Sequence, residues 1–252
     1  MDLGISEKVA LVTGAGRGIG RAIARQLARE GTIVAAVSRS LQPLESLQAE
    51  LRPNGDRHRI LALDLTTAGA AGEVVDWVTR ELGLPDIIVH NVGGSLGISD
   101  PLAPSQDWER VWRFNLGVPL DINRALIPAL TERRWGRIVH VSTNATITFQ
   151  AYAAYVSAKS ALNAYVKIVG RSVAKSNVVI SAVLPGALRV EGRYLARLEA
   201  ENGDAWAEYV RNHLAIGRLA GDDEIASAVV FLCSSGASYC AGAFLPVDGA
   251  II

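Results

Sequence analysis

Seven apolar runs of strand length, separated by longer stretches of helical length, leave few folds open to this sequence. Most runs are continuously apolar, as expected for parallel strands that are covered on both faces. The stretches between them, such as 19–30 and 68–82, have the spacing of amphipathic helices. Repeated strand–helix alternation predicts the α/β class, with a doubly wound parallel sheet of about seven strands. The expected strands are 8–13, 33–38, 59–64, 86–91, 137–142, 178–184 and 243–247.

The length of 252 residues suits one domain, 1–252, and no linker-like segment divides it. One insertion is long: residues 187–217 separate the sixth expected strand from the next helix and contain Tyr194, Trp206 and Tyr209. A long segment after the carboxyl end of a strand predicts a substrate lid.

Charge and cysteine content exclude several classes of protein. Lysine and arginine balance aspartate and glutamate at 25 each, so no long-range field favours nucleic acid or an anionic membrane. Residues 1–7 lack the basic and apolar regions of a signal peptide, and no apolar run is long enough to span a membrane. With only two cysteines, Cys233 and Cys240, we expect a reduced, cytoplasmic chain.

A glycine-rich turn follows the first expected strand and opens the first expected helix. Its glycines are Gly14, Gly18 and Gly20, within 13–20. Glycine lets the backbone approach phosphate closely, and the helix N-terminus favours the negative charge. The turn therefore predicts a pyrophosphate cradle for a dinucleotide.

A phenol and an ammonium lie four residues apart, at Tyr155 and Lys159. In a helix, residues with this spacing are neighbours on one face. Free tyrosine has a pKa near ~10, too high for ready proton exchange at neutral pH, and a nearby ammonium favours the phenolate. We therefore expect Lys159 to lower the pKa of Tyr155.

The Gly-x-x-x-Gly-x-Gly spacing, together with Tyr-x-x-x-Lys, resembles the short-chain dehydrogenase/reductase family over the whole chain. Further family motifs follow in order, and among members the closest general likeness is to 3-oxoacyl-carrier-protein-reductase-like proteins. The matching residues are Asp64 after the third strand, Asn91-Val92-Gly93 after the fourth, Asn115 in a helix, Pro185-Gly186 after the sixth strand, and Val247-Asp248-Gly249 near the C-terminus.

The resemblance implies a Rossmann-like oxidoreductase. By resemblance, Tyr155 is the acid/base, Lys159 tunes it and holds the nicotinamide ribose, and Asn115 positions a proton-relay water. The cofactor contacts that it implies, with Tyr155 and Lys159 among them, are Gly14, Arg17, Gly18, Ile19, Gly20, Ser38, Arg39, Asp64, Leu65, Asn91, Gly93, Pro185, Gly186 and Leu188.

The family's active-site hydroxyl has two candidates at the end of the fifth strand. Counting back from Tyr155 by the family's usual thirteen residues gives Ser142, and counting forward from Gly136 through the strand gives Thr143. A one-residue slip turns a side chain to the other face of a sheet, so the two cannot serve equally. Both remain open at this point.

Cofactor choice can be read after the second strand. Family members that prefer NAD usually carry an acidic residue there, and this chain has Ser38 followed by Arg39. Arg17 in the glycine turn adds a second cation. Both could meet a 2′-phosphate, so the sequence favours NADP(H) over NAD(H).

Two positions depart from the family pattern. His90 replaces the first asparagine of the usual Asn-Asn-Ala-Gly, and Val190 replaces a threonine that contacts the carboxamide. His90 and His140 lack accompanying carboxylates or cysteines, so we expect packed histidines and no metal site. We also expect packing or a subunit interface, and no nucleic-acid platform, at four aromatic residues: Trp108, Trp112, Phe114 and Trp135.

These observations predict an NADP(H)-dependent enzyme that interconverts a ketone and a secondary alcohol. A polyol or sugar dehydrogenase is the second enzymatic hypothesis, and a cofactor-binding module without turnover is the third. The substrate is a small carbonyl or alcohol compound. Its mostly apolar pocket candidates are Ser95, Leu96, Ile98, Thr148, Phe149, Tyr152, Leu188 and Tyr194.

The helices expected around 107–130 and 152–175 predict an oligomer. Relatives are usually tetramers that pair these helices. The second helix carries small and apolar residues on more than its sheet-facing side: Ala158, Ala161, Leu162, Ala164, Val166 and Val169. A helix that is apolar around much of its girth should be buried on more than one side, so we expect a homotetramer.

Overall fold

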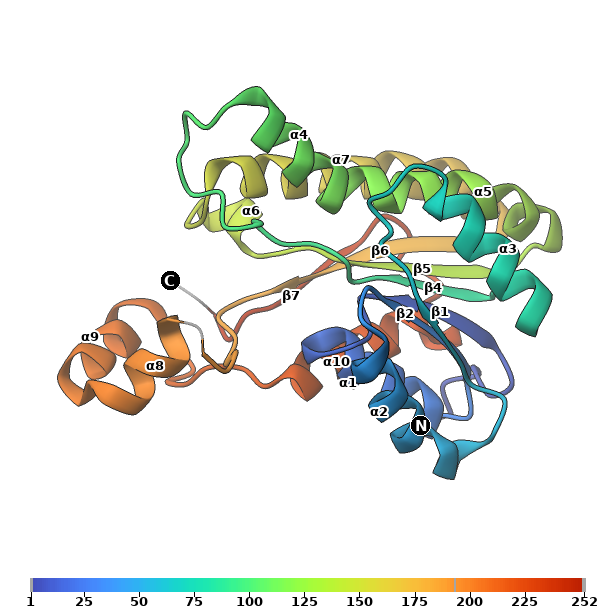
Figure 1. The fold of residues 1–252 in the computed structure, drawn as a ribbon, viewed down its shortest axis with the longest axis horizontal. Helices are drawn as coiled ribbons and strands as arrows, with labels where there is room; N and C mark the ends of the chain where they lie inside the picture. The colour runs from blue at the N-terminus through green and yellow to red at the C-terminus, as the bar shows by residue number, and fades with distance from the viewer. Residues whose placement is uncertain (1, 193, 251–252) are drawn as a thin grey trace.

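The computed structural model describes residues 2–192 and 194–250 and contains a seven-stranded, wholly parallel sheet (Figure 1). The strand order is β3-β2-β1-β4-β5-β6-β7. All seven expected strands are present, with ends within two residues of the predicted ones, so the predicted fold class is confirmed. Their bounds are β1 (Val9–Thr13), β2 (Ile33–Ser38), β3 (Arg59–Ala62), β4 (Ile87–His90), β5 (Gly136–Val141), β6 (Val178–Pro185) and β7 (Phe244–Val247).

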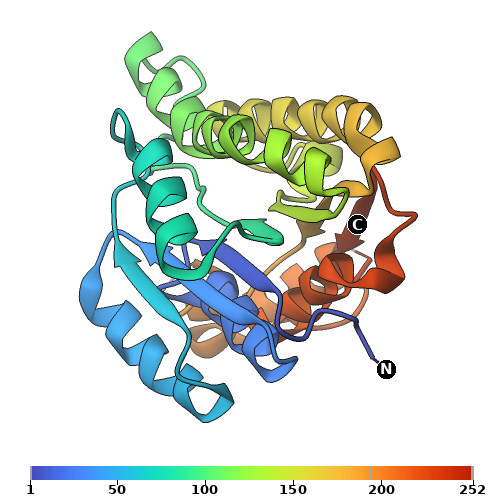
Figure 2. The ribbon, with the colours of Figure 1, turned by 90° about the vertical axis from the view of Figure 1, so that its right-hand side faces the viewer.

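Two layers of helices cover the sheet, one on each face (Figures 1 and 2). Neighbouring residues of β1 supply both cores: Ala10 and Val12 pack with the first layer, and Val9 and Leu11 with the second. Continuous apolar sequence is needed because successive side chains of a strand point to opposite faces. The first layer is α1 (Gly18–Arg29), α2 (Leu41–Leu51) and α10 (Asp222–Cys233); the second is α3 (Ala70–Leu82), α5 (Val118–Arg133) and α7 (Ala153–Val173).

The helix expected around 107–130 is in fact two helices, α4 (Ser105–Trp112) and α5, joined by a π-helical turn, Arg113–Gly117. The Asn115 amide donates to the carbonyl of Val111, four residues earlier, at 2.8 Å. A side chain that enters the i→i−4 ladder displaces the regular helical bonds, which accounts for the break.

The insertion at 187–217 contains two further helices, α8 (Tyr194–Glu201) and α9 (Gly203–His213). They follow the carboxyl end of β6 and project beyond the sheet (Figure 1). The remaining short elements are α6 (Ala145–Thr148) and the 3₁₀ turns Arg52–Asn54, Ala174–Ser176 and Ser235–Ala237. Among the described residues, no helix has the length and apolar character that crossing a membrane requires.

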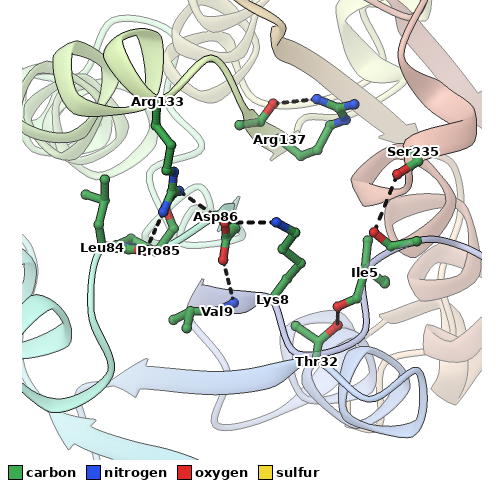
Figure 3. A network of polar contacts seen from close by, with 12 residues as sticks. Ile5, Lys8, Val9, Thr32, Leu84, Pro85, Asp86, Arg133, Arg137 and Ser235 are labelled. Atoms are coloured by element: carbon green, nitrogen blue, oxygen red, sulfur yellow. Dashed lines mark hydrogen bonds and ion pairs between the residues drawn. The ribbon is translucent and has the colours of Figure 1, made fainter.

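Asp86 ties together the amino-terminal edge of the sheet (Figure 3). Its carboxylate accepts a hydrogen bond from the Val9 amide at 2.9 Å and pairs with Lys8 at 3.5 Å and Arg133 at 3.2 Å. The side chain is largely buried, and partnered carboxylates in such places are well satisfied. This anchor leaves the opposite edge, where the strands end, for a ligand.

Trp135 is a packing residue, as expected. Lys8 and Arg137 lie over its ring, with the ammonium 4.4 Å and the guanidinium 4.8 Å from the centroid. Arg137 is fully buried and donates to the carbonyls of Ser234 at 3.2 Å and Asn177 at 3.1 Å. Burial lowers the Arg137 pKa from its usual value.

Candidate active site at the carboxyl ends of the strands

The sheet reverses its winding between β1 and β4, and Thr13 joins the two strand ends there. The Thr13 hydroxyl donates to the carbonyl of Val89 at 3.2 Å and accepts from the Asn91 amide at 3.1 Å. The Asn91 side chain in turn donates to the carbonyl of Gly14 at 3.0 Å. Ligands of doubly wound sheets bind in the crevice at this point of reversal.

The glycine turn between β1 and α1 requires glycine for two reasons. Gly14 and Gly18 have φ of +67° and +56°, in the left-handed region that other residues avoid. At Gly20, a Cβ atom would lie 2.3 Å from the carbonyl oxygen of Gly14. The helix that follows has no side-chain cap and no acidic residue in its first turn. Its first N–H groups are therefore available to an anion.

A cleft of about 1030 Å³ runs along the carboxyl ends of the strands. It brings together all the predicted cofactor residues except Gly20, which packs inside the turn. The predicted residues that line it are Gly14, Arg17, Gly18, Ile19, Ser38, Arg39, Asp64, Leu65, Asn91, Gly93, Tyr155, Lys159, Pro185, Gly186 and Leu188, with Ser142 and Thr143 beside them.

At one end of the cleft, Asp64 shapes the turn after β3. One carboxylate oxygen accepts from the Thr66 amide at 2.9 Å and from its hydroxyl at 2.6 Å. These hydrogen bonds lower the Asp64 pKa, and the positive charge of Arg39 adds to the effect. Arg17 and Arg39 both line the cleft, so their guanidinium groups can meet a ligand there.

At the other end of the cleft, Pro185-Gly186 is backed by the C-terminal motif. The Gly186 amide donates to the carbonyl of Val247 at 3.1 Å. A Cβ atom on Gly186 would lie 2.6 Å from the Cα of Asp248. The two motifs, far apart in sequence, thus fix one wall of the cleft.

The structure overturns the expected pKa of Tyr155. Burial raises it above the usual value, and a hydrogen bond with the Thr143 side chain only partly opposes this effect. The Lys159 ammonium donates instead to the carbonyl of Val141, at 2.7 Å. The expectation of a lowered pKa was wrong for this state because desolvation of the buried phenol dominates, and the Lys159 ammonium is directed at Val141.

Lys159 is itself buried, with 3% of its surface exposed. Burial lowers the pKa of its ammonium to about 8. The close approach of Gly93 contributes to this burial, since a Cβ atom there would lie 2.9 Å from the Lys159 nitrogen.

The two candidate hydroxyls at the end of β5 have different partners. Ser142 is buried, and its hydroxyl donates to Asn163 of α7 at 2.7 Å. Thr143 lines the cleft together with Tyr155, and its hydroxyl accepts from the Ala145 amide at 3.2 Å, so its own proton can be donated to a ligand. Because the Ser142 hydroxyl is committed to Asn163, these partners favour the forward count through the strand, which pointed to Thr143.

The Asn115 side chain does not line the cleft. It is fully buried, accepts from the Gly94 amide at 2.9 Å, and donates to the Gly94 carbonyl at 2.8 Å. Its amide thus holds the loop after β4 in addition to breaking the helix. Any contact of Asn115 with a relay water would come from the backbone of the π turn, a type of irregularity often found at functional sites.

His90 and His140 are buried and packed, as expected. They pair across β4 and β5, and their rings stack 4.6 Å apart. Asn123 of α5 is hydrogen-bonded to both, at 2.8 Å and 3.4 Å. Burial lowers the pKa of His90 to about 4 and, with the charges of His90 and Lys159, holds that of His140 well below its usual value.

Acid should therefore destabilise the fold before its surface carboxylates are protonated. Below pH 6.5 the unfolded histidines bind protons while the folded ones stay neutral, so the free energy of unfolding should fall as the pH drops from 6.5 towards 4. The slope is about 1.4 kcal/mol per pH unit for each histidine. Urea unfolding at several pH values measures it. His90→Asn should reduce the slope, because it removes one of the buried neutral histidines.

The predicted substrate residues do not all line one cleft, in contrast to nearly all of the predicted cofactor residues. Leu188 lines the main cleft, and Leu96 lines a second cleft of about 530 Å³ beside it. Phe114, for which we expected packing or a subunit interface, is partly buried and lines both clefts. Phe149, Tyr152 and Tyr194 are exposed, and Ser95, Ile98 and Thr148 are partly buried.

A family model described as short chain dehydrogenase matches residues 8–198 of this chain. The chain belongs to the short-chain dehydrogenase family. A 3-oxoacyl-[acyl-carrier-protein] reductase from Pseudomonas aeruginosa is 31% identical over 248 residues, which cover 98% of each chain. D-threitol dehydrogenase from Mycolicibacterium smegmatis is 32% identical over 250 residues, covering 98% of this chain and 94% of the relative.

Solved structures of other short-chain dehydrogenases superpose closely on this fold. L-sorbose reductase from Gluconobacter frateurii, complexed with NADPH and L-sorbose, has a TM-score of 0.90 and 30% identity, and the match covers 100% of this chain and 99% of that one. A 3-oxoacyl (acyl-carrier-protein) reductase from Agrobacterium tumefaciens with NADP bound has a TM-score of 0.89 and 27% identity, with 98% and 95% covered.

Sequence reasoning missed Asn163, a polar residue of this short-chain dehydrogenase that contacts the cleft residue Ser142. It lies four residues after Lys159 and eight after Tyr155, so the helical repeat that paired those two residues also places Asn163 on their face. The signal was present in the sequence, but no motif drew attention to it.

Proposed function

We propose that this protein is an NADP(H)-dependent oxidoreductase that interconverts a ketone and a secondary alcohol. The observation that carries the proposal is the single cleft that places the glycine turn at one end and Tyr155, Lys159 and Thr143 at the other. A protein that only bound a dinucleotide would need the first part and not the second. The NADP and NADPH in the two related crystal structures support the cofactor class.

The groups that line the cleft suit the phosphates and the ribose of NADP(H). The uncapped N-terminus of α1 and the glycine turn suit a pyrophosphate, and the arginines Arg17 and Arg39 suit a 2′-phosphate. When bound, the nicotinamide supplies or accepts the hydride. Lys159 uses one of its three N–H donors on Val141 among the described residues, which leaves donors for ribose hydroxyls.

The protein's own groups handle the proton. Charge that develops on the substrate oxygen needs oriented donors, and Tyr155 and Thr143, which both line this end of the cleft, carry suitable hydroxyls. Tyr155 gives its proton to the oxygen in reduction and takes one in oxidation. Its raised pKa keeps it protonated at neutral pH in the absence of ligands. Thr143 holds the oxygen, and the π turn at Asn115 serves the relay to solvent.

Reversing the charge after β2 tests the cofactor assignment. Arg39→Asp should weaken NADPH use and improve NADH use, because a carboxylate repels the 2′-phosphate and accepts hydrogen bonds from ribose hydroxyls. The measurement is the ratio of kcat/KM for the two cofactors. Arg29→Asp, at the far end of α1, is the matched control and should leave the ratio unchanged. An unchanged ratio in Arg39→Asp would contradict the assignment.

A panel of ketones and alcohols, followed at the nicotinamide absorbance, tests the activity itself. Turnover of simple ketones supports the main proposal. Turnover confined to sugars and polyols would favour the second candidate, which the likeness to D-threitol dehydrogenase and L-sorbose reductase supports. Cofactor binding without turnover on any member would favour a binding module.

We further propose a homotetramer, a cytoplasmic location and closure of residues 187–217 over the substrate. The free thiols of Cys233 and Cys240 support the location. On α7, Ala158, Leu162 and Val166 are buried within the protomer, whereas Ile168 is 67% exposed. The apolar surface left for a partner is therefore smaller than the sequence indicated.

Light scattering at micromolar concentration measures the assembly. We expect about four times the chain mass of 26.8 kDa. Ile168→Glu should lower that mass if α7 lies in an interface, since a buried unpaired charge is unfavourable. A wild-type mass of one chain, with full activity, would rule the tetramer out.

A further inference from the structure

The face of α7 that bears Tyr155 and Lys159 continues to Asn163, and both Lys159 and Asn163 contact the end of β5. Lys159 holds the carbonyl of Val141, and Asn163 accepts from the hydroxyl of Ser142 at 2.7 Å. The same helix therefore holds the two residues that precede Thr143. Residues spaced by four share a helical face, which makes this one continuous contact.

Asn163 also reaches the residues that follow Thr143. Its amide donates to the hydroxyl of Thr146 at 3.0 Å, and that hydroxyl donates to the carbonyl of Thr143 at 2.9 Å. One side chain thus restrains the strand end on both sides of Thr143. The two hydrogen bonds use the opposite ends of the amide, so each depends on how the other is made.

We propose that Asn163 is a positioning residue that decides which of the two adjacent hydroxyls enters the active site. By holding Ser142 against α7, it turns the next side chain, Thr143, towards Tyr155. Neighbouring residues at a strand end point to opposite sides, so fixing one fixes the other. This inference rests on the proposed function, because it assigns Asn163 a role through Thr143.

Backbone pairing and Asn163 act together at this strand end. Ser142 and Thr143 could each supply a hydroxyl, and the pairing of β5 with β6 sets the side to which each residue points. The Ser142 amide donates to Val183 at 2.8 Å and the Asn144 amide donates to Pro185 at 2.9 Å, so β6 aligns the backbone on both sides. Asn163 adds the side-chain restraint that the backbone pairing lacks.

A double-mutant cycle with Thr143 tests the role. Asn163→Ala should lower kcat about tenfold or more, since a misplacement of about 1 Å in a reacting group can cost up to about 10²-fold. KM and the Kd for NADPH should change by less than about twofold, because the glycine turn and Lys159 are untouched. In the Thr143→Ala background, the same Asn163→Ala change should have almost no further effect on kcat.

The opposite result would overturn the proposal. If Asn163→Ala lowers kcat equally with and without Thr143, or weakens NADPH binding in parallel, then Asn163 supports α7 generally and does not position Thr143. An unchanged kcat in the single variant would also overturn it. Ser172→Ala is the matched control, because its hydroxyl donates to the carbonyl of Val169 within α7, and it should leave kcat unchanged.

A second variant covers the case in which the alanine protein does not fold. Asn163→Asp keeps the size of the side chain and an acceptor for Ser142, but it removes the donor to Thr146. The Thr146 hydroxyl then turns to the carboxylate and releases Thr143. We expect Asn163→Asp to lower kcat less than Asn163→Ala does, and to have no further effect in the Thr143→Ala background. An equal loss of kcat in both backgrounds contradicts the proposal. Failure of the proposed function itself shows separately, as a wild-type enzyme without turnover that still binds NADPH.

Discussion

Tyr155→Phe should lower kcat about 10²–10⁴-fold, the usual contribution of general acid–base catalysis, and leave cofactor binding intact. Phenylalanine preserves the ring that packs with α4 in the small cluster around Val111 and Ala158. It removes only the hydroxyl of a residue that lines the cleft together with Thr143. The loss should therefore appear in kcat, with the NADPH Kd within about twofold of wild type.

The control for this variant is Tyr165→Phe. Tyr165 lies on the same helix, and its hydroxyl accepts a hydrogen bond from the Asn123 side chain at 3.2 Å. It lies outside the cleft, so its replacement should change kcat little while lowering stability by about 1 kcal/mol for a lost hydrogen bond. If the kcat of Tyr155→Phe were close to that of Tyr165→Phe, Tyr155 would not be the catalytic acid/base.

Most of the fold could be predicted because its signals are local and repeated. The continuous apolar sequence of a strand such as Ile33–Ser38 is needed only when both faces of the sheet are covered. The glycine turn could also be predicted from local sequence, since Gly20 has no room for a side chain and Gly14 has positive φ. Each of these structural requirements restricts the residue type at single positions, so it is visible in the amino-acid sequence.

What could not be predicted depends on partners distant in sequence. The break at Asn115 arises because its side chain bonds to Val111 and Gly94, and nothing in the local helical pattern reveals those bonds. The pKa of Tyr155 is the clearer case. The spacing to Lys159 indicated attraction, but the sign was decided by burial, which depends on the whole tertiary packing.

The choice between Ser142 and Thr143 shows the same limit at the scale of one residue. Two counts disagreed because the connection from Thr143 to Tyr155 differs by one residue from the family's usual spacing. The strand register is held by pairing of β5 with β6, so the difference falls in the loop that contains α6. Loops absorb such changes more easily than paired strands.

Thr143→Ala should then cost about 10²–10³-fold in kcat, the range for removal of one donor to a developing oxyanion, whereas Ser142→Ala should cost less than about tenfold. The Ser142 hydroxyl is already committed to Asn163, so its loss acts through packing and the position of its neighbour. Thr143→Ser keeps a hydroxyl on the same carbon and should restore most of the activity, which separates the loss of the donor from the loss of a methyl group. Rates for the three variants at saturating NADPH provide the measurement. A larger loss in Ser142→Ala would mean that the strand end turns by one residue during catalysis and that Asn163 releases Ser142. Small losses in both variants would mean that neither hydroxyl holds the substrate oxygen.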